Sequence, residues 1–352
     1  MRFEDILRRL EDLNGYIVSG DAPRLKLDAN ENLFLPREVM RGYLREAADS
    51  SDPRLYPAAE AEELQAAIAK RIGVCADQVV LGGGGDQLIN LLITALLRPG
   101  DGLLSLTPTF SMYSVAASVR GVEHQQFPMD PNLTLDPDGL LAAVKGNTRM
   151  IEIVNPNNPT GVQFSEGAVK KVVQGFDGPV LIDEAYVEYG RYSLAASCGE
   201  TENLVVLRTL SKAYGLAGLR LGYLIAGPEL ASALRGVQDP YPASGVAIRM
   251  GLRMLEETRI VDERVSQAKS ERTWLTSMLS RIPGIVVIPS DASFLTFKTP
   301  RDAASVQNAL LAKGVAVKLV GGVPGLGDCL RVTVAPRPLL EDFLTCLRLV
   351  LS

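Results

Sequence analysis

The sequence contains a single histidine and few cysteines. His124 is the only histidine among 352 residues, so a Ser-His-Asp triad or a histidine-based metal site is not expected. The cysteines are far apart and form no C-x-x-C pair: Cys75, Cys198, Cys329 and Cys346. This spacing is typical of reduced thiols and favours neither a disulfide framework nor a zinc site.

The sequence also lacks long apolar runs and a large excess of charge. No run reaches the roughly 18 apolar residues that a membrane-spanning helix needs. The charged segment Met1–Leu13 does not resemble a signal peptide, and we expect a cytoplasmic protein. The net charge of −5 argues against nucleic acid as the main partner, although it allows a local basic pocket for a small anion.

Apolar residues make up 47% of the chain and are grouped in a regular order. Short apolar runs, typical of buried strands, alternate with helical patterns, and the runs are Val79–Leu81, Gly102–Leu106, Met150–Val154, Pro179–Ile182, Leu204–Leu207 and Gly222–Ala226. This alternation predicts an α/β fold with a mainly parallel sheet between layers of helices.

The pattern changes after Pro242. A long helical pattern over about residues 246–281 is followed by shorter strand and helix patterns, which predict an α+β unit with an antiparallel sheet. We therefore expect a large domain over residues 41–243. A small domain is expected from residues 244–352 together with an N-terminal arm, residues 1–40.

Candidate functional residues follow the predicted parallel strands, at the edge where such sheets bind ligands. Four glycines, Gly82–Gly85, precede Asp86 and the start of a helix, which suits an anion but equally suits a plain turn. Asp183 ends a buried strand, where a carboxylate needs a positively charged partner. Lys212 lies in a glycine-containing loop between two strands, and a lysine at such a position is a nucleophile for carbonyl groups.

An amine that can form a Schiff base, an acid for a pyridinium nitrogen and a phosphate cradle together describe a pyridoxal phosphate site. With these residues the chain resembles the fold type I pyridoxal-phosphate-dependent aminotransferases of class II, and most closely the histidinol-phosphate aminotransferase family. The matching segments lie in the same order along nearly the whole chain: 27–32, 55–57, 84–87, 108–113, 157–161, 183–186, 209–222 and 329–333. The resemblance implies a large domain with a mostly parallel seven-stranded sheet and a smaller α+β domain.

The resemblance implies roles for individual residues around pyridoxal 5′-phosphate. Lys212 matches the lysine that holds the cofactor and moves the substrate proton, and Asp183 matches the acid that pairs with the ring nitrogen. Asn158 and Tyr186 match the hydrogen-bond partners of the ring oxygen. The remaining cofactor-binding positions are Gly85, Asp86, Gln87, Ser211 and Arg220 towards the phosphate, Phe110 on the ring face, and Tyr56, which reaches the phosphate from the neighbouring subunit of a homodimer.

The substrate end is matched less completely. Arg331 corresponds to the arginine that clamps the substrate carboxylate, for which its planar fork is suited. Tyr16, Asn30 and Tyr241 match substrate-binding positions, and Tyr241 is expected to reach the neighbouring subunit's site. Lys318 stands where the family usually has arginine, and Ser293 stands where it usually has asparagine. These two departures concern the phosphorylated substrate and leave the cofactor site intact.

The expected reaction is transamination between L-histidinol phosphate and 2-oxoglutarate, a step of histidine biosynthesis. Three different functions remain open. An aromatic or broad-specificity aminotransferase and a threonine-phosphate decarboxylase would use the same cofactor. A cofactor-fold sensor without catalysis is the third, which the acidic charge balance and the extent of the resemblance disfavour.

Overall fold

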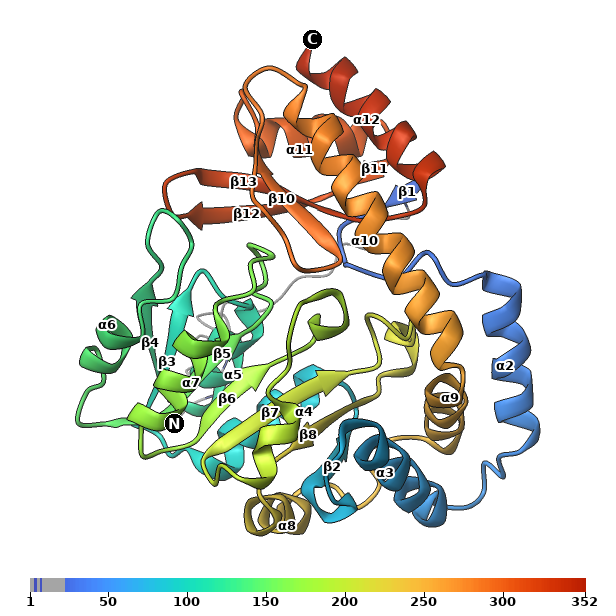
Figure 1. Ribbon diagram of the computed structural model, residues 1–352, viewed down its shortest axis with the longest axis vertical. Helices are drawn as coiled ribbons and strands as arrows, with labels where there is room; N and C mark the ends of the chain where they lie inside the picture. The colour runs from blue at the N-terminus through green and yellow to red at the C-terminus, as the bar shows by residue number, and fades with distance from the viewer. Residues whose placement is uncertain (1–2, 5–6, 8–22) are drawn as a thin grey trace.

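The computed structural model describes residues 3–4, 7 and 23–352, and its centre is a sheet of seven strands (Figure 1). The spatial order is β2 (Val79–Gly82), β8 (Gly222–Ile225), β7 (Leu204–Thr209), β6 (Val180–Asp183), β5 (Thr148–Val154), β3 (Gly102–Thr107) and β4 (Glu123–Pro128). Strand β8 is antiparallel to both of its neighbours, and the other pairs are parallel. The predicted α/β fold with a mostly parallel seven-stranded sheet is confirmed.

Helices cover both faces of this sheet. One face packs against α4 (Gly85–Leu96), α5 (Ser111–Arg120) and α8 (Pro228–Val237). The other packs against α3 (Ala58–Ile72), α6 (Pro137–Ala142), α7 (Glu166–Gly175) and α9 (Gly245–Glu256). Because β6 and β7 are buried on both faces, their sequences are continuous apolar runs rather than alternating ones.

A second unit contains an antiparallel sheet, as the sequence predicts. Its strands are β12 (Lys318–Val323), β13 (Gly327–Thr333), β10 (Phe294–Lys298) and β9 (Val286–Val287), in that spatial order. The helices of this unit are α10 (Thr258–Ser280), α11 (Ala303–Ala312) and α12 (Arg337–Leu351). Near the N-terminus β1 (Leu25–Lys26) pairs in parallel with β11 (Val315–Ala316), which ties this part of the expected arm to the small unit.

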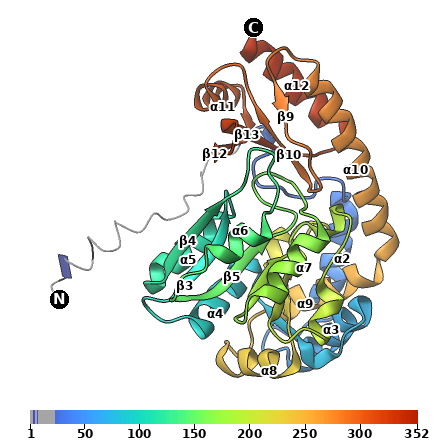
Figure 2. The same ribbon diagram turned by 60° about the vertical axis from the view of Figure 1, so that its left-hand side comes forward.

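The long helical pattern over 246–281 forms two helices instead of one. Helix α9 ends before Glu257 and α10 begins after it (Figure 2). Helix α9 packs against α3 and α2 (Arg37–Asp49), while α10 extends from α9 to α12. This packing places α9 with the large unit and favours a boundary near Glu257. The boundary expected from the sequence, at residue 243, remains a prediction. Among the described residues, no helix combines the length and apolarity needed to cross a membrane.

Candidate active site

A cavity of about 620 Å³ lies between the carboxyl ends of the central strands and the hairpin formed by β12 and β13. Twelve of the sequence-predicted site residues line it: Asn30, Gly85, Asp86, Phe110, Asn158, Asp183, Tyr186, Ser211, Lys212, Arg220, Lys318 and Arg331. These residues come from both units, and the fold brings them to one place. Tyr16 lies outside the described residues.

Lys212 follows β7 and is partly buried in the cavity wall. Its Nζ donates a hydrogen bond to the backbone carbonyl of Ala29 at 3.0 Å. The same nitrogen lies 5.6 Å from the centre of the Tyr186 ring. The amine is therefore oriented by a segment of the N-terminal arm and an aromatic face, and both contacts are with residues that line the cavity.

Asp183 is the last residue of β6 and is 4% exposed. Its Oδ2 accepts a hydrogen bond from the Tyr113 hydroxyl at 2.9 Å, and its Oδ1 accepts one from the Ala185 N–H at 3.0 Å. Burial raises the pKa of Asp183 to about 6, while these two donors lower it. Both donors are neutral, so this buried carboxylate would suit a positively charged group such as a protonated ring nitrogen.

Tyr113 is a site residue whose role the sequence does not reveal. It is completely buried, and its ring lies edge-on to that of Phe110 with 6.4 Å between ring centres. Because the segment 108–113 enters α5 at Ser111, Phe110 and Tyr113 are three residues apart and can lie on the same side of the chain. The segment is recognisable from the sequence, but the contact with Asp183 depends on how α5 packs on the sheet.

The expected partners of the cofactor ring oxygen are joined to the expected substrate residues. Asn30 Nδ2 donates to the Tyr186 hydroxyl at 3.0 Å. Arg331 Nη1 donates to Asn158 Oδ1 at 2.5 Å, and Arg331 Nη2 donates to the Asp28 carbonyl at 2.8 Å. These contacts connect the arm, the large unit and the small unit around the cavity.

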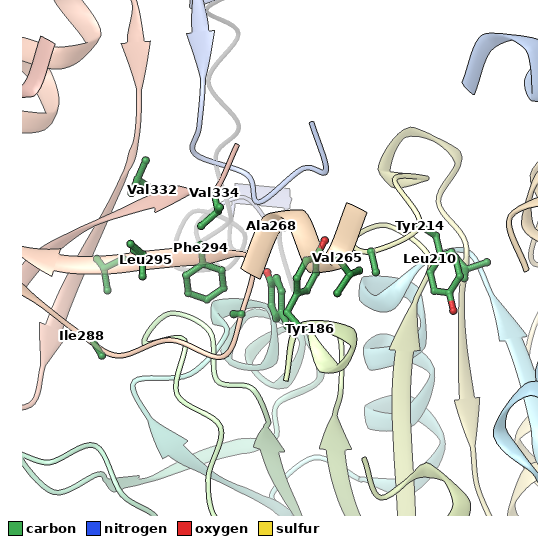
Figure 3. Packing of buried hydrophobic residues seen from close by; sticks show 14 of the residues in the cluster. Tyr186, Leu210, Tyr214, Val265, Ala268, Ile288, Phe294, Leu295, Val332 and Val334 are labelled. Carbon is green, nitrogen blue, oxygen red and sulfur yellow. The ribbon is translucent and has the colours of Figure 1, made fainter. Parts of the chain in front are cut away.

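Apolar packing supports the same junction. The rings of Tyr186 and Phe294 meet edge to face, with 5.1 Å between their centres (Figure 3). The Arg331 guanidinium lies over the Phe294 ring at 5.2 Å from its centre. Tyr186 and Phe294 are both buried. The hydroxyl end of Tyr186 therefore faces polar groups while its ring packs against β10.

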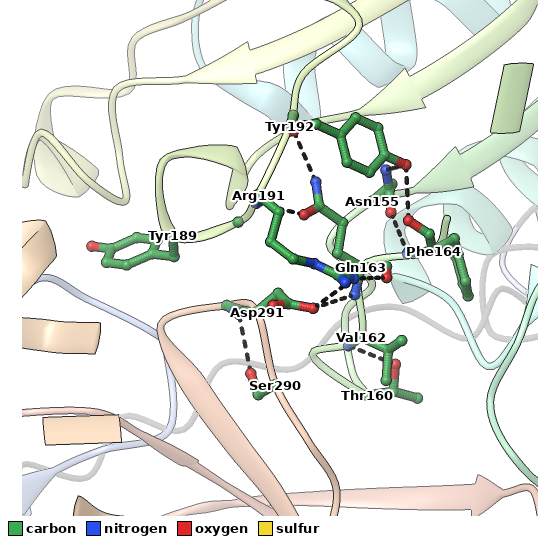
Figure 4. A network of polar contacts seen from close by, with 12 residues as sticks. Asn155, Thr160, Val162, Gln163, Phe164, Tyr189, Arg191, Tyr192, Ser290 and Asp291 are labelled. Carbon is green, nitrogen blue, oxygen red and sulfur yellow. Dashed lines mark hydrogen bonds and ion pairs between the residues drawn. The ribbon is translucent and has the colours of Figure 1, made fainter. Parts of the chain in front are cut away.

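The loop that carries Asn158 is held by a polar network (Figure 4). Asn155 Nδ2 donates to the Tyr192 hydroxyl at 2.8 Å and its Oδ1 accepts from the Phe164 N–H at 2.9 Å. Gln163 Nε2 donates to the Tyr192 carbonyl at 2.8 Å, and the Gln163 N–H donates to Asp291 Oδ2 at 3.2 Å. Asp291 belongs to the small unit, so the loop is fixed by both units.

The expected phosphate corner lies where α4 begins. Gly84 has φ +90°, and a Cβ built on it would lie 2.9 Å from Arg220 Nη2. Arg220 also forms an ion pair with Asp86, with 2.8 Å between Nη2 and Oδ2. Ser211 follows β7 and lines the same cavity. A helix N-terminus, a hydroxyl and a guanidinium at one corner are a suitable set for an anion.

Three predicted residues lie elsewhere. The Gln87 side chain does not line the cavity, and its Oε1 accepts a hydrogen bond from the Gly83 N–H at 3.2 Å. Tyr56 and Tyr241 are 76% and 44% exposed, and their rings stack with 4.2 Å between centres. Both tyrosines line a second cavity of about 460 Å³. Their reach into a neighbouring subunit remains a prediction.

Lys212, Asp183 and the corner at α4 fit the pyridoxal phosphate that the resemblance implies. The amine suits the aldehyde, the carboxylate with neutral donors suits the ring nitrogen, and the glycine-lined corner suits the phosphate. The fit rests on these contacts and on the fact that all three groups line one cavity.

Comparisons with known proteins agree with this geometry. The family model described as "Aminotransferase class I and II" matches residues 22–344. A histidinol-phosphate aminotransferase of Thermoanaerobacter pseudethanolicus is 36% identical over 335 residues, covering 94% of this chain and 95% of that protein.

Solved structures show the same fold. A histidinol-phosphate aminotransferase of Sinorhizobium meliloti in complex with pyridoxal-5′-phosphate has a TM-score of 0.89 at 23% identity, covering 99% of this chain and 97% of that chain. An L-threonine-O-3-phosphate decarboxylase of Porphyromonas gingivalis has a TM-score of 0.80 at 20% identity, covering 93% of this chain and 99% of that chain. At these identities the structural likeness shows the fold, whereas the family model spans most of the sequence. The chain belongs to the class I and II aminotransferases.

Proposed function

We propose that this chain transfers the amino group of L-histidinol phosphate to 2-oxoglutarate, with pyridoxal 5′-phosphate as its cofactor. The observation that supports a phosphorylated substrate is a pair of cationic residues. Lys318 and Arg331 are directly opposite each other on β12 and β13, and both line the cavity. Like charges at opposed positions repel, so a dianion at this place is favourable. A phosphate monoester carries a charge of about −1.5 to −2 at pH 7.

The identity to histidinol-phosphate aminotransferases over most of the chain supports the same substrate. Lys318 meets a phosphate as a point charge, whereas the arginine usual in that family would meet it as a fork. Arg331, already bonded to Asn158, supplies the planar fork on the neighbouring strand. This fork would take the carboxylate of 2-oxoglutarate in one half of the reaction and, because L-histidinol phosphate has no carboxylate, its phosphate in the other. The departure at Lys318 therefore changes the form of the phosphate contact and keeps its charge.

The residues of this chain divide the work around the cofactor. Asp183 holds a negative charge for the ring nitrogen, and Asn158 and Tyr186 are the partners of the ring oxygen. The cavity is also lined by Gly85, Asp86, Ser211 and Arg220, which would hold the phosphate, and by Phe110, which would lie at the ring face. When bound, pyridoxal phosphate supplies an electron sink for the electron pair left by the broken Cα–H bond.

Lys212 is the residue that moves the proton. Its Nζ holds the cofactor before the amino donor arrives and then accepts the Cα proton as a general base. The bond to the Ala29 carbonyl keeps the amine at the cavity wall. Asn30 and Tyr186 border this side of the cavity, where they would orient the substrate beside the amine.

The proposal includes a homodimer in which Tyr56 and Tyr241 contact the neighbouring site. Their stacked and exposed rings support it, because large aromatic side chains on a protein surface are typical of interfaces. Sedimentation of the wild type and of the Tyr56→Ala variant tests this part. A wild type that sediments as a monomer would contradict it.

The reaction is tested by titrating the cofactor-loaded protein with amino donors and recording its visible absorption. L-histidinol phosphate should convert the band of the lysine-bound cofactor to that of its amine form at low concentration, and 2-oxoglutarate should reverse the change. Conversion by L-glutamate and L-phenylalanine alone would show a different aminotransferase. A protein with no band for a lysine-bound cofactor would contradict the role of Lys212.

A threonine-phosphate decarboxylase is the second candidate, because it too needs a dianion site beside the cofactor. The pair Lys318 and Arg331 and the fold likeness to the Porphyromonas gingivalis enzyme favour it over an aromatic or broad-specificity aminotransferase. The two phosphate-dependent reactions differ in which bond at Cα is held perpendicular to the ring. Release of carbon dioxide from L-threonine phosphate, without conversion of the band by L-histidinol phosphate, would decide for the decarboxylase.

A further inference from the structure

A second carboxyl group is buried behind the active site. Glu152 lies on β5 and is completely buried. In the parallel pairing of β5 with β6, Glu152 is opposite Leu181 and Val154 is opposite Asp183, so both carboxyl groups extend from the same face of the sheet. This face is the one covered by α4 and α5. The expected ring-nitrogen partner therefore has a second acid close behind it.

The two carboxyl groups have different hydrogen-bond environments. Both oxygens of Asp183 accept a hydrogen bond, from the Tyr113 hydroxyl and the Ala185 N–H. Oε1 of Glu152 accepts one from the Thr109 hydroxyl at 3.0 Å. Its Oε2 is buried and has no hydrogen-bond partner among the described residues. Because donors stabilise the ionised form, Asp183 is the better place for a negative charge and Glu152 the better place for a proton.

The other groups that face Glu152 within the described chain are neutral. Ser105 is opposite Glu152 on β3, and its hydroxyl is 3.0 Å from Nε2 of His124 on β4. Burial lowers the pKa of His124, so the imidazole is neutral at neutral pH. Burial also holds the pKa of Tyr113 well above its usual value, and its hydroxyl remains protonated. The hydroxyls of Ser105 and Thr109 lower the pKa of Glu152, but burial raises it by more.

Two further acids lie near Asp183, and the charges of both raise its pKa: Glu184 and Asp86. Glu184 forms an ion pair with Arg208, with 3.0 Å between Oε2 and Nη2. Asp86 belongs to the start of α4 and forms an ion pair with Arg220, with 2.8 Å between Oδ2 and Nη2. The negative charge of Asp86 is thus balanced by the Arg220 guanidinium at the phosphate corner. Glu152 instead avoids an unbalanced charge by keeping its proton.

We propose that Glu152 is a positioning residue that keeps its proton behind Asp183, so that Asp183 alone carries the negative charge offered to the cofactor ring nitrogen. The charge of Asp183 disfavours ionisation of Glu152 on the same face of the sheet, and the environments of the two carboxyl groups decide which one ionises. Burial raises the pKa of Glu152 to about 8, above the value of about 6 for Asp183, which gives the same order as the hydrogen bonds. This inference rests on the proposed cofactor and not on the identity of the amino donor.

Infrared spectroscopy of the full-length protein, with and without pyridoxal phosphate, tests the assignment. A protonated carboxyl has a carbonyl stretch well separated from that of a carboxylate. We expect such a band at pH 7 in the wild type, its loss with an apparent pKa near 8, and its absence in Glu152→Gln. Glu152→Met also removes the acid at similar volume. If one of the two variants does not fold, the other can still be measured. Asp183→Asn should keep the band.

A band at pH 7 that persists in both Glu152 variants and disappears in Asp183→Asn would reverse the assignment and refute the proposal. The absence of any protonated carboxyl band at pH 7 in the wild type would refute it too. Because the spectrum is also recorded without cofactor or substrate, these outcomes do not depend on the proposed reaction. Glu123→Gln is the matched control, since Glu123 is exposed, is bonded to Lys145 at 2.7 Å and has a pKa lowered to about 2.

The effect on Asp183 is read from the visible absorption of the cofactor-loaded protein between pH 6 and 10. When Glu152 loses its proton, its new charge alters the electric field at the cofactor ring and so the visible absorption. The absorption of the wild type and of Glu123→Gln should therefore change with an apparent pKa near 8. Glu152→Gln should lack this change. If the infrared band behaves as expected but the visible titrations of all three proteins coincide, Glu152 is a buried acid without influence on the site, and the positioning role is wrong.

Discussion

Replacing Glu152 by glutamine should change how the stability of the protein depends on pH. An unfolded glutamate loses its proton near its ordinary pKa of 4.5, whereas the folded protein keeps it up to about 8. Between these values the folded state binds one more proton than the unfolded state, so the free energy of unfolding falls as the pH rises. Glutamine has no proton to lose, and the variant lacks this fall.

The size of the effect follows from the pKa difference. Each pKa unit corresponds to about 1.4 kcal/mol. The cost of keeping Glu152 protonated is therefore about 3 kcal/mol at pH 7 and below about 1 kcal/mol at pH 5. Relative to the wild type, Glu152→Gln should gain about 2.5 kcal/mol between pH 5 and pH 7, and the gain should level off above the folded pKa. Any cost in stability from burying the glutamine amide is the same at every pH and does not alter the pH dependence of the free energy of unfolding.

The assay is urea unfolding of both proteins at fixed concentration from pH 5 to pH 9, followed by circular dichroism. Taking the difference between the two proteins at each pH cancels the other titrating groups, because they are common to both. Glu123→Gln should lower the stability by an amount that hardly varies over this range, since both the folded pKa of about 2 and the ordinary value of 4.5 lie below pH 5 and the ion pair with Lys145 is present throughout. A difference between wild type and Glu152→Gln that does not vary with pH would refute the reasoning, because Glu152 would then be ionised in the folded protein at pH 5.

Three further substitutions test the site itself. Tyr113→Phe removes one of the two donors to the Asp183 carboxylate, so the pKa of Asp183 should rise and the acidic limb of the kcat/KM profile should move to higher pH by about one to two units. Arg331→Lys replaces a fork with a point charge, and kcat/KM for L-histidinol phosphate should fall about 10- to 100-fold in steady-state assays. Gly84→Ala places a Cβ against Arg220 at a φ of +90°, and equilibrium dialysis should show about 10- to 100-fold weaker binding of pyridoxal phosphate. Unchanged profiles, rates or affinities would contradict the assigned contacts.

The sequence alone determined the class of fold, and most of the site residues that it predicted line the cavity. Buried strands are recognisable because apolar runs such as 179–182 and 204–207 have no exposed face, and their alternation with helices leaves few topologies. The residues at the carboxyl ends of these strands could be named because parallel strands end at one edge of the sheet. Lys212, Asp183 and Asn158 line the cavity for this reason.

The sequence predicted other features only in part. The periodicity over 246–281 is helical throughout, yet the chain leaves the helix at Glu257, where α9 turns to pack against α3 and α2. Gln87 belongs to a segment with the expected pattern, but its side chain turns back to the Gly83 N–H. Periodicity and motif order are local properties, and neither contains the direction in which a side chain finally points.

Only the tertiary structure decided which polar groups meet in the interior. Nothing near Glu152 in the sequence indicates that it shares a face with Asp183, because the two strands are joined through α7 and the contact depends on their register. The bond from Tyr113 to Asp183 likewise depends on how α5 lies on the sheet. The charge on a buried carboxyl is set by its distance from water and from donors. These distances exist only after the chain has folded, and they decide which acid serves the reaction.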